Sequence, residues 1–443
     1  MRRWIIFWLA IICVLTTACR AAPSVDSDAV RSETSDVRQI TVLYTNDEHG
    51  WLAATDDIDG AAGMLGLWRD VEGYTEGGPF LVLSGGDTWT GPAISSWFDG
   101  ESMIDVMNAM GYDAAAIGNH EFDFGVDGLR ARIDQAEFPF LSANIRDTAT
   151  GEPADFALPY VIQEINGIKV GIIGLSATDT PEKTMPTHVA NLEFTPYKTA
   201  LEAVVPQVQA EGAELLVVTS HLCSFEMVAL APVAAELGVA MIGGGDCHES
   251  FNQTVGGVVL VEARSNMQAY ARVDLTFDAG SGTVVDSESK IIKNIDSTSD
   301  VELAEVVAEW QAALDDDLMH VIGYADREIG QRSAAMFNLV TDAWLASYPA
   351  DIAMTNTGGF RQSIPAGEIT LADVVGVLPF DNTLVDVEMT GAHVIASYEH
   401  GRPAIAGMTT RGGYKLSDGT LIDRDATYHV LVNDFMYPGG DGY

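Results

Sequence analysis

Residues 114–125 read "AAAIGNHEFDFG", an apolar run that stops at glycine and is followed at once by asparagine, histidine, glutamate and aspartate. A polar turn would account for part of this composition, because Gly, Asn and Asp tolerate unusual backbone angles or bond to their own main chain. The alternative is a buried strand that ends at Gly118 and presents reactive side chains at its carboxyl end. The sequence on either side bears on this choice.

Similar apolar runs recur along the chain from residue 38, each followed by a polar or glycine-rich break. They are QITVLYT (39–45), FLVLSG (80–85), DAAAIG (113–118), FPFLSA (138–143), KVGIIGLSA (169–177), ELLVVTS (214–220) and VAMIGG (239–244). Helical spacing between them predicts helices at 101–110, 126–136 and 198–211. Strands that alternate with helices indicate a layered α/β fold whose sheet is buried on both faces.

The end of this first part carries a different pattern. GVVLVEA (257–263) and ARVDLTFD (271–278) follow one another with little room for helices, so antiparallel strands are expected there. Residues 299–322 open with a Ser or Asp cap and continue with helical spacing, which predicts a connecting helix. A second, smaller mixed α/β unit is expected beyond it, and a chain of 443 residues does favour two domains.

The composition is strongly acidic, with a net charge of −41 and 47% hydrophobic residues. Such a chain can bury a core, but its field repels nucleic acid and anionic membranes, so a nucleic-acid polymer is not an expected partner. The acidity serves at least to keep the surface solvated. An anionic substrate would need local positive charge, for which metal ions are a source.

The first residues, 1–37, are predicted to be an export signal and a polar tether. Two arginines, an apolar stretch and small residues precede Cys19, which resembles a lipoprotein cleavage box with threonine at position 16 in place of the usual leucine. Lipidation of Cys19 would tether the chain outside the cytoplasmic membrane, and an uncleaved anchor helix is the alternative. Both interpretations predict an extracytoplasmic location, in the periplasm or at the cell surface.

Polar clusters follow five of the apolar runs. They contain Asp47 and His49; Asp87; Asn119, His120 and Asp123; His221; and Asp246 and His248. Ligands of open α/β sheets bind beyond the carboxyl ends of the strands, so these clusters are expected to converge. Of the 9 histidines in the chain, 4 lie in these clusters. A single histidine here would be read as structural, but the joint pattern is not expected by chance.

Imidazole with carboxylate is a ligand set for zinc, manganese, cobalt or iron, whereas calcium prefers oxygen alone. One aspartate can bridge two divalent cations, and Asp87 is the candidate. We therefore expect a pair of divalent ions and a metal-bound hydroxide that attacks phosphorus.

The motifs NDEHG, GGDTWTG, GNHEFDFG, SHL and GGDCHE, in this order, resemble those of the calcineurin-like metallophosphoesterases. The 5′-nucleotidase branch, with its UDP-sugar hydrolases, is the most similar. The resemblance covers residues 38–443 and implies a four-layer sandwich over 38–298, a linker helix over 299–322 and a substrate-binding domain over 323–443.

The resemblance also assigns roles to the clustered residues. One metal would be held by Asp47, His49, Asp87 and His248, and the other by Asp87, Asn119, His221 and Asp246. His120 would face the scissile phosphate, oriented by Asp123. Asp246 departs from the family pattern, which has histidine there; aspartate can bind the same ion, but its charge would weaken the Lewis acidity of that ion, or the site is degraded.

Two cysteines flank the same cluster, Cys223 after His221 and Cys247 before His248. A disulfide, a thiolate ligand and two inert thiols all remain open, and inert thiols are the first expectation. The export signal makes a disulfide chemically permissible.

The second domain has weaker motifs of its own, TNTGGFRQ, VLPFDNTL and VNDFMYPGGDGY. In the family, matching loops bind the nucleoside. The resemblance therefore implies that Phe380 and Phe435 stack on the base, that Asp441 binds the ribose, and that Asn356, Arg361 and Asn382 make polar contacts. Closure of the two domains about the linker is expected. Relatives continue beyond "GGDGY", so a truncated C-terminus is expected.

The expected substrate is a nucleotide, and the expected reaction is release of its phosphate. Within the same fold, a 2′,3′-cyclic-nucleotide phosphodiesterase with 3′-nucleotidase activity and a sulfur-oxidation hydrolase are alternatives. A non-catalytic nucleotide-binding lipoprotein is an alternative of another class. The sequence gives no indication of the oligomeric state.

Overall fold

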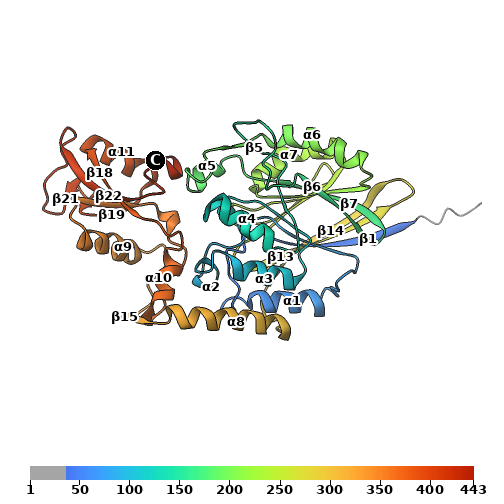
Figure 1. Cartoon of the computed structure of the whole chain (residues 1–443), viewed down its shortest axis with the longest axis horizontal. Coiled ribbons are helices and arrows are strands. Elements are labelled where there is room, and N and C mark those ends of the chain that lie inside the picture. The colour runs from blue at the N-terminus through green and yellow to red at the C-terminus, as the bar shows by residue number, and fades with distance from the viewer. Residues whose placement is uncertain (1–35) are drawn as a thin grey trace, which may run out of the picture. The chain divides into compact units, whose positions relative to one another are not determined.

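The computed structural model describes residues 36–443, and Figure 1 shows the arrangement of its elements. The predicted signal and Cys19 lie outside the described residues. Two six-stranded sheets dominate the first part. The first has the order β14 (Thr283–Lys293), β13 (Ala269–Asp278), β1 (Val37–Thr45), β2 (Phe80–Ser84), β3 (Ala114–Ala116), β4 (Phe140–Leu141). The second has the order β11 (Ser250–Val255), β12 (Val258–Ala263), β10 (Val239–Gly243), β9 (Leu215–Ser220), β7 (Ile168–Leu175), β6 (Tyr160–Ile165).

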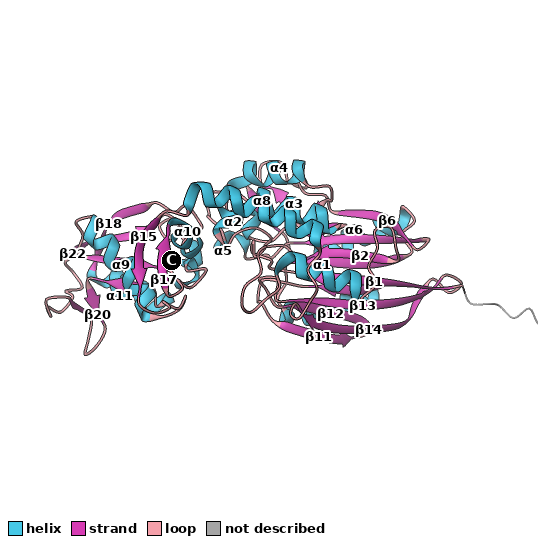
Figure 2. Cartoon of the chain, turned by 90° about the horizontal axis from the view of Figure 1, so that it is seen from below, coloured by secondary structure: helices cyan, strands magenta, loops and turns pink. Residues whose placement is uncertain are grey.

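The strands that carry the polar clusters are parallel within each sheet. β1, β2, β3 and β4 run parallel, as do β7, β9, β10 and β12. The predicted strand at 271–278, β13, runs antiparallel to β1 on one side and to β14 on the other, and Figure 2 shows the three strands together. β12 meets the prediction on one side only, because it pairs antiparallel with the edge strand β11 but runs parallel to β10. Between the parallel strands β10 and β12 the chain direction is reversed by β11, whereas helices do this elsewhere in the sandwich.

The layers follow from which residues are buried. Val42 and Tyr44 of β1 pack with Ile172 and Val217 of the other sheet in a core between the two sheets. The outer face of the first sheet is covered by α1 (Gly60–Asp70), α2 (Ala93–Ser96), α3 (Glu101–Met110), α4 (Gly125–Gln135) and α8 (Val301–Leu318). The outer face of the second sheet is covered by α6 (Tyr197–Ala210) and α7 (Ser224–Glu236). This is a four-layer α/β sandwich, and the three predicted helices lie within one residue of their expected bounds.

α8 is the predicted connecting helix, shorter than expected. It begins where the Asp300 carboxylate accepts a hydrogen bond from the Leu303 amide, 3.0 Å, which satisfies a free N–H of the first turn. The predicted range extends to residue 322, but the helix ends at Leu318 and the next strand, β15 (Val321–Ala325), begins within that range. Leu303, Leu314 and Leu318 are buried in the core that α1 and α3 also line, so α8 packs on the first sandwich along its length.

The remaining residues form the smaller mixed α/β part. Its main sheet has the order β18 (Leu384–Thr390), β22 (Thr427–Asn433), β16 (Ile352–Thr355), β19 (Ala404–Ala406). β15 pairs with β17 (Gly367–Thr370), and the helices are α9 (Ala334–Ser347), α10 (Leu371–Val377) and α11 (Gly391–Gly401). Short elements occur in both parts: the first contains α5 (Thr180–Lys183), β5 (Ile145–Asp147) and β8 (Leu192–Phe194), and the smaller one contains β20 (Met408–Thr409) and β21 (Lys415–Leu416). Among residues 36–443, no helix combines the length and hydropathy that crossing a bilayer requires.

Candidate active site

The loops after the parallel strands hold the polar clusters in an unusual backbone conformation. Asp47, His49, Asp87, Asp246 and His248 all have φ between 48° and 71°, the left-handed region that residues other than glycine rarely adopt. Such a conformation costs on the order of 1–3 kcal/mol per residue and persists where the surrounding structure imposes it. Five strained residues in three loops mark this edge of the sandwich as a functional site.

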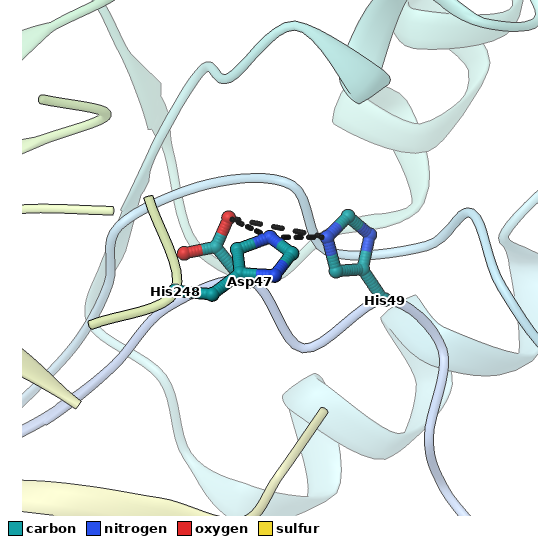
Figure 3. A group of neighbouring side chains, drawn as sticks. All are labelled: Asp47, His49 and His248. Atoms are coloured by element: carbon teal, nitrogen blue, oxygen red, sulfur yellow. Dashed lines mark hydrogen bonds and ion pairs between the residues drawn. The ribbon is translucent and has the colours of Figure 1, made fainter. Parts of the chain in front are cut away.

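Asp47, His49 and His248 form the first group (Figure 3). Asp47 Oδ1 lies 3.4 Å from His248 Nε2 and 3.9 Å from His49 Nε2, and the two imidazole nitrogens are 3.2 Å apart. His49 Nδ1 lies 3.0 Å from the Thr90 carbonyl oxygen, which fixes the ring so that Nε2 faces the group. Three donor atoms from the first and last clusters of the sandwich therefore face one point.

The second group lies against the first and is built around Asp87 and His221. His221 Nε2 is 3.0 Å from Asp87 Oδ2, and it is 3.9 Å from Asp47 Oδ1 and 3.9 Å from Asp246 Oδ1. Its Nδ1 lies 2.8 Å from the Gly85 carbonyl oxygen. Although burial lowers it, the carboxylate of Asp87 and its neighbours hold the pKa of His221 well above its usual range. The site thus has a surplus of negative charge that a cation would balance.

Two buried nitrogen or oxygen atoms of this group lack ordinary hydrogen bonding: Asn119 Oδ1 has no partner, and His221 Nε2 contacts only carboxylate oxygens, the nearest being Asp87 Oδ2. Buried polar groups are normally satisfied, so each such atom needs an explanation. Oxygen and imidazole nitrogen are both ligand atoms for zinc, manganese, cobalt or iron. The residues therefore fit a divalent cation.

Glu121 is a residue of the site to which the sequence analysis assigned no role. Its buried carboxylate accepts hydrogen bonds from the Asp87 and Gly118 amides, 2.8 and 2.6 Å, and from the Thr88 amide and hydroxyl, 2.7 and 2.9 Å. Burial, followed by the nearby Asp87 carboxylate, raises the pKa of Glu121 to about 7, whereas these four donors favour its ionised form. Glu121 thereby ties the Asp87 loop to the Asn119 loop.

Gly118 shows why the apolar run ends in glycine. A Cβ at this position would collide with the Asp87 carboxylate. The strand therefore passes directly beneath Asp87, and Asn119 and His120 follow at the next two positions. The opening stretch is a strand end that carries reactive groups and not an ordinary polar turn.

His120 lies between the metal-ligand candidates and open space. Its Nδ1 is 2.7 Å from Asp123 Oδ2, and its Nε2 is 3.9 Å from Asp87 Oδ2. Although burial lowers it, the Asp123 and Asp87 carboxylates raise the pKa of His120. The ring is therefore oriented by one carboxylate and keeps a proton readily, which suits a hydrogen-bond donor or general acid.

A cavity of about 210 Å³ brings the two parts of the chain together. From the first part it is lined by Asp87, Asn119, His120, Asp123, Asp246 and His248; from the second by Asn356, Arg361, Phe380, Asn382, Phe435 and Asp441. Asp47, His49 and His221 are buried and contact these residues from behind. All the site residues predicted from sequence are thus at this cavity or directly beneath it.

The residues of the second part are held by neutral contacts as well as charged ones. Asn356 Nδ2 donates to Asp441 Oδ2, 2.9 Å, and Asn433 Nδ2 donates to Asn356 Oδ1, 2.9 Å. Arg361 Nη2 reaches His49 Nε2, 3.2 Å. The Phe380 ring stacks on His120, with 5.6 Å between ring centroids. An aromatic face, a carboxylate and a guanidinium are therefore available in one cavity.

Two features near the site, a disulfide and a lysine, differ from or add to the sequence prediction. Cys223 and Cys247 form a disulfide with their Cα atoms 5.1 Å apart, so the expectation of inert thiols was wrong. The fold brings the loops after β9 and β10 together, a proximity that spacing along the chain does not reveal. The other is Lys183, which lines the cavity and forms an ion pair with Asp246.

Similarities to known proteins bear on the family to which the chain belongs. Residues 319–416 match the family model described as "5'-nucleotidase, C-terminal domain". The chain is 30% identical to a 5′-nucleotidase of Vibrio vulnificus, over 91% of this chain and 86% of that protein. A crystal structure of a 5′-nucleotidase precursor from Thermus thermophilus superposes with a TM-score of 0.78 at 26% identity, covering 91% of each chain.

A sulfate thiohydrolase, SoxB, from Thermus thermophilus superposes with a TM-score of 0.72 at 20% identity, covering 89% of each chain. At that identity the likeness concerns the fold alone. The sequence match to the Vibrio protein covers 91% of this chain and so extends over both parts of the molecule. The chain belongs to the 5′-nucleotidase family of phosphoester hydrolases.

Proposed function

We propose that the protein is a metal-dependent 5′-nucleotidase that releases the phosphate of extracytoplasmic nucleotides. The observation that supports this most is the composition of the cavity. Metal-ligand candidates line one side, and an aromatic and polar pocket lines the other. Family relatives named as 5′-nucleotidases point the same way. Residues 38–298 would be the catalytic domain, 299–322 the linker helix and 323–443 the substrate-binding domain.

The first proposed cation would be held by Asp47, His49, Asp87 and His248, and the second by Asp87, Asn119, His221 and Asp246. The unpartnered Asn119 oxygen and the contact between His221 Nε2 and Asp87 Oδ2 support this division. When bound, the cations would supply Lewis acidity toward the phosphate and lower the pKa of water. The Glu121 carboxylate keeps the backbone of the Asp87 loop in place, because it accepts hydrogen bonds from the Asp87 and Thr88 amides.

His120 would act on the transferring phosphate. Its Nδ1 is paired with Asp123, so Nε2 is free to donate a hydrogen bond or a proton to a phosphate oxygen. Arg361 would add a guanidinium to the same anion, because it reaches His49 at the edge of the ligand group. These residues bind and orient the phosphate and stabilise the charge that develops on it.

The nucleoside would lie in the second half of the cavity. Phe380 and Phe435 would stack on the base, a contact worth about 1–3 kcal/mol per base and tolerant of base identity. Asp441 would bind the ribose hydroxyls, and Asn356 and Asn382 would make polar contacts beside it. Asn356 already bonds to Asp441, so the two act as a preformed polar pair.

The test is phosphate release from AMP by protein stripped with a chelator and resupplied with manganese, zinc or cobalt. The expected result is activity that disappears on stripping and returns with a divalent ion. Assays of 2′,3′-cyclic AMP, a UDP-sugar and a thiosulfonate ester run beside it. A clear preference for one of these would replace the 5′-nucleotidase proposal, and nucleotide binding without release would replace the catalytic one.

The location is a further part of the proposal. Export and lipidation of Cys19 would place the enzyme at the outer face of the cytoplasmic membrane or in the periplasm. The Cys223–Cys247 disulfide supports an oxidising compartment. Mass spectrometry of the mature protein tests this directly, since an unmodified Met1 would contradict it.

A further inference from the structure

Lys183 is the one cation that the cavity contains besides Arg361 and the histidines, among the described residues. It is the last residue of α5, and its Nζ forms ion pairs with Asp246 Oδ2 and, at 3.0 Å, with Asp179 Oδ2. The Asp246 side chain is 8% exposed, whereas that of Asp179 is 49% exposed. The pair with Asp246 is therefore the stronger of the two, because solvent screens the buried Asp246 carboxylate less.

The two oxygens of Asp246 face different groups. Oδ1 lies 3.9 Å from His221 Nε2, in the second ligand group, while Oδ2 faces Lys183 and lies 3.3 Å from the disulfide sulfur of Cys223. The backbone amide of Asp246 is bonded to both Asp47 oxygens, 3.2 and 3.1 Å. Its left-handed backbone, with φ of 71°, adds a further constraint. The carboxylate is thus fixed with one oxygen toward the ligands and the other toward a cation.

We propose that Lys183 and Asp246 form one ligand unit of zero net charge, in which Lys183 sets how much negative charge Asp246 presents to the second cation. This rests on the proposed metal centre. A bare carboxylate would add a full negative charge to a site that already holds Asp47 and Asp87. The ammonium group of Lys183 offsets that charge and occupies the outer oxygen. Lys183 is a positioning residue, since it acts through Asp246.

This unit has an unusual consequence for substitutions. Removal of Lys183 leaves the carboxylate uncompensated, so a dication should bind more tightly, but its Lewis acidity should fall. Replacement of Asp246 by neutral histidine leaves the lysine uncompensated, so the dication should bind more weakly. Removal of both charges should bring affinity back. A purely structural role for Lys183 predicts none of these opposed signs.

The experiment is a calorimetric titration of metal-free protein with Mn²⁺ for wild type, Lys183→Met, Asp246→His and the double variant. Lys183→Arg tests whether another cation rescues, and Lys198→Met removes a matched lysine from an exposed pair with Glu202 on α6. For two unit charges at this range, an uncompensated charge changes a binding constant by roughly tenfold or more. Thermal unfolding without metal checks that each variant folds.

The expected result is about tenfold tighter binding of the weaker Mn²⁺ ion by Lys183→Met and about tenfold weaker binding by Asp246→His. The double variant and Lys183→Arg should stay within about threefold of wild type, and kcat of Mn²⁺-saturated Lys183→Met should fall. If Lys183→Met binds Mn²⁺ with unchanged affinity, as Lys198→Met should, or with lowered affinity, the proposal alone is overturned. A wild type that binds no Mn²⁺ overturns the metal centre as well.

Discussion

The two linings of the cavity differ in what they bury. Beneath the cavity the sandwich buries the carboxyl groups of Asp47, Asp87 and Glu121. Beyond residue 319 the buried polar side chains of the described chain are neutral: Thr341, Thr355, Asn356, Thr370 and Asn433. Ionised carboxylates are costly to bury unless they are paired or bind metals. The first lining is therefore built for cations, and the second for a ligand that needs shape and hydrogen bonds.

The two linings are also fixed in different ways. In the sandwich, the side chains are held by left-handed backbone conformations and by hydrogen bonds that backbone amides donate to the Glu121 carboxylate. In the smaller part, Asp441 alone of the lining residues other than glycine has a left-handed backbone, with φ of 53°, and side chains mainly hold one another: Asn356 donates to Asp441, and Asn382 Nδ2 donates to Asp434 Oδ1 at 2.9 Å. The first arrangement suits chemistry that tolerates little displacement, and the second suits recognition that adapts to several bases. Substitutions on the two sides should therefore affect kcat and KM differently.

The largest effect is expected for His120→Asn. Asparagine keeps a polar group beside Asp123 but cannot give up a proton, so kcat for phosphate release should fall by about 10²- to 10⁴-fold, with KM changed far less. Steady-state kinetics on AMP measure both constants. His429→Asn, which alters the exposed histidine paired with Asp386, serves as the matched control and should keep wild-type kcat. A loss confined to KM would assign His120 to binding and remove the contrast between the linings.

Glu121→Gln should have the next largest effect. The glutamine amide keeps one acceptor oxygen but would place its N–H groups either against the Asp87 and Gly118 amides or against the Thr88 amide, all of which already donate to this position. Outer residues that orient metal ligands typically contribute about 10- to 100-fold in metal affinity or activity. Metal titration of the stripped protein measures the loss. Glu302→Gln on the exposed face of α8 is the control, and equal affinities in both variants would contradict the role given to Glu121.

Phe435→Leu tests the second lining. Loss of one stacking surface should raise KM for AMP roughly tenfold, since base stacking contributes about 1–3 kcal/mol, while kcat changes by less than about threefold. Phe225→Leu alters a phenylalanine that is 69% exposed on α7 and provides the comparison. Should kcat fall as strongly as in His120→Asn, the division of labour between the linings would be wrong.

The smallest effect concerns pH and a partly buried carboxyl of the sandwich away from the cavity. Burial raises the pKa of Asp113 from 3.8 to about 6. Between these values the folded chain keeps a proton that the unfolded chain has released, so this contribution to stability falls as pH rises from 3.8 to about 6. Asp113→Asn removes that loss. Urea unfolding should show the variant gaining on wild type across this window and no further above it; a constant difference would contradict the raised pKa.

Sequence reasoning reached the strand-end clusters because each follows an apolar run, and parallel strands place their carboxyl ends together. It identified the helices at 101–110 and 198–211 from the clear helical periodicity of their apolar residues. It could not find Lys183, since that lysine joins the site through a four-residue helix far from any cluster. The disulfide and the parallel register of β12 depend on contacts between segments distant in sequence. The C-terminal lining was predictable only through family resemblance.

The central claim is that the ends of five strands cradle a pair of cations bridged by Asp87. The most direct measurement is the metal content of the purified protein, equilibrated with Mn²⁺ and freed of excess, determined by inductively coupled plasma mass spectrometry. The account predicts two ions per wild-type chain and no more than one in Asp87→Asn, because that residue contributes to both ligand groups. Fewer than one ion in the wild type, or an unchanged content in Asp87→Asn, would contradict it.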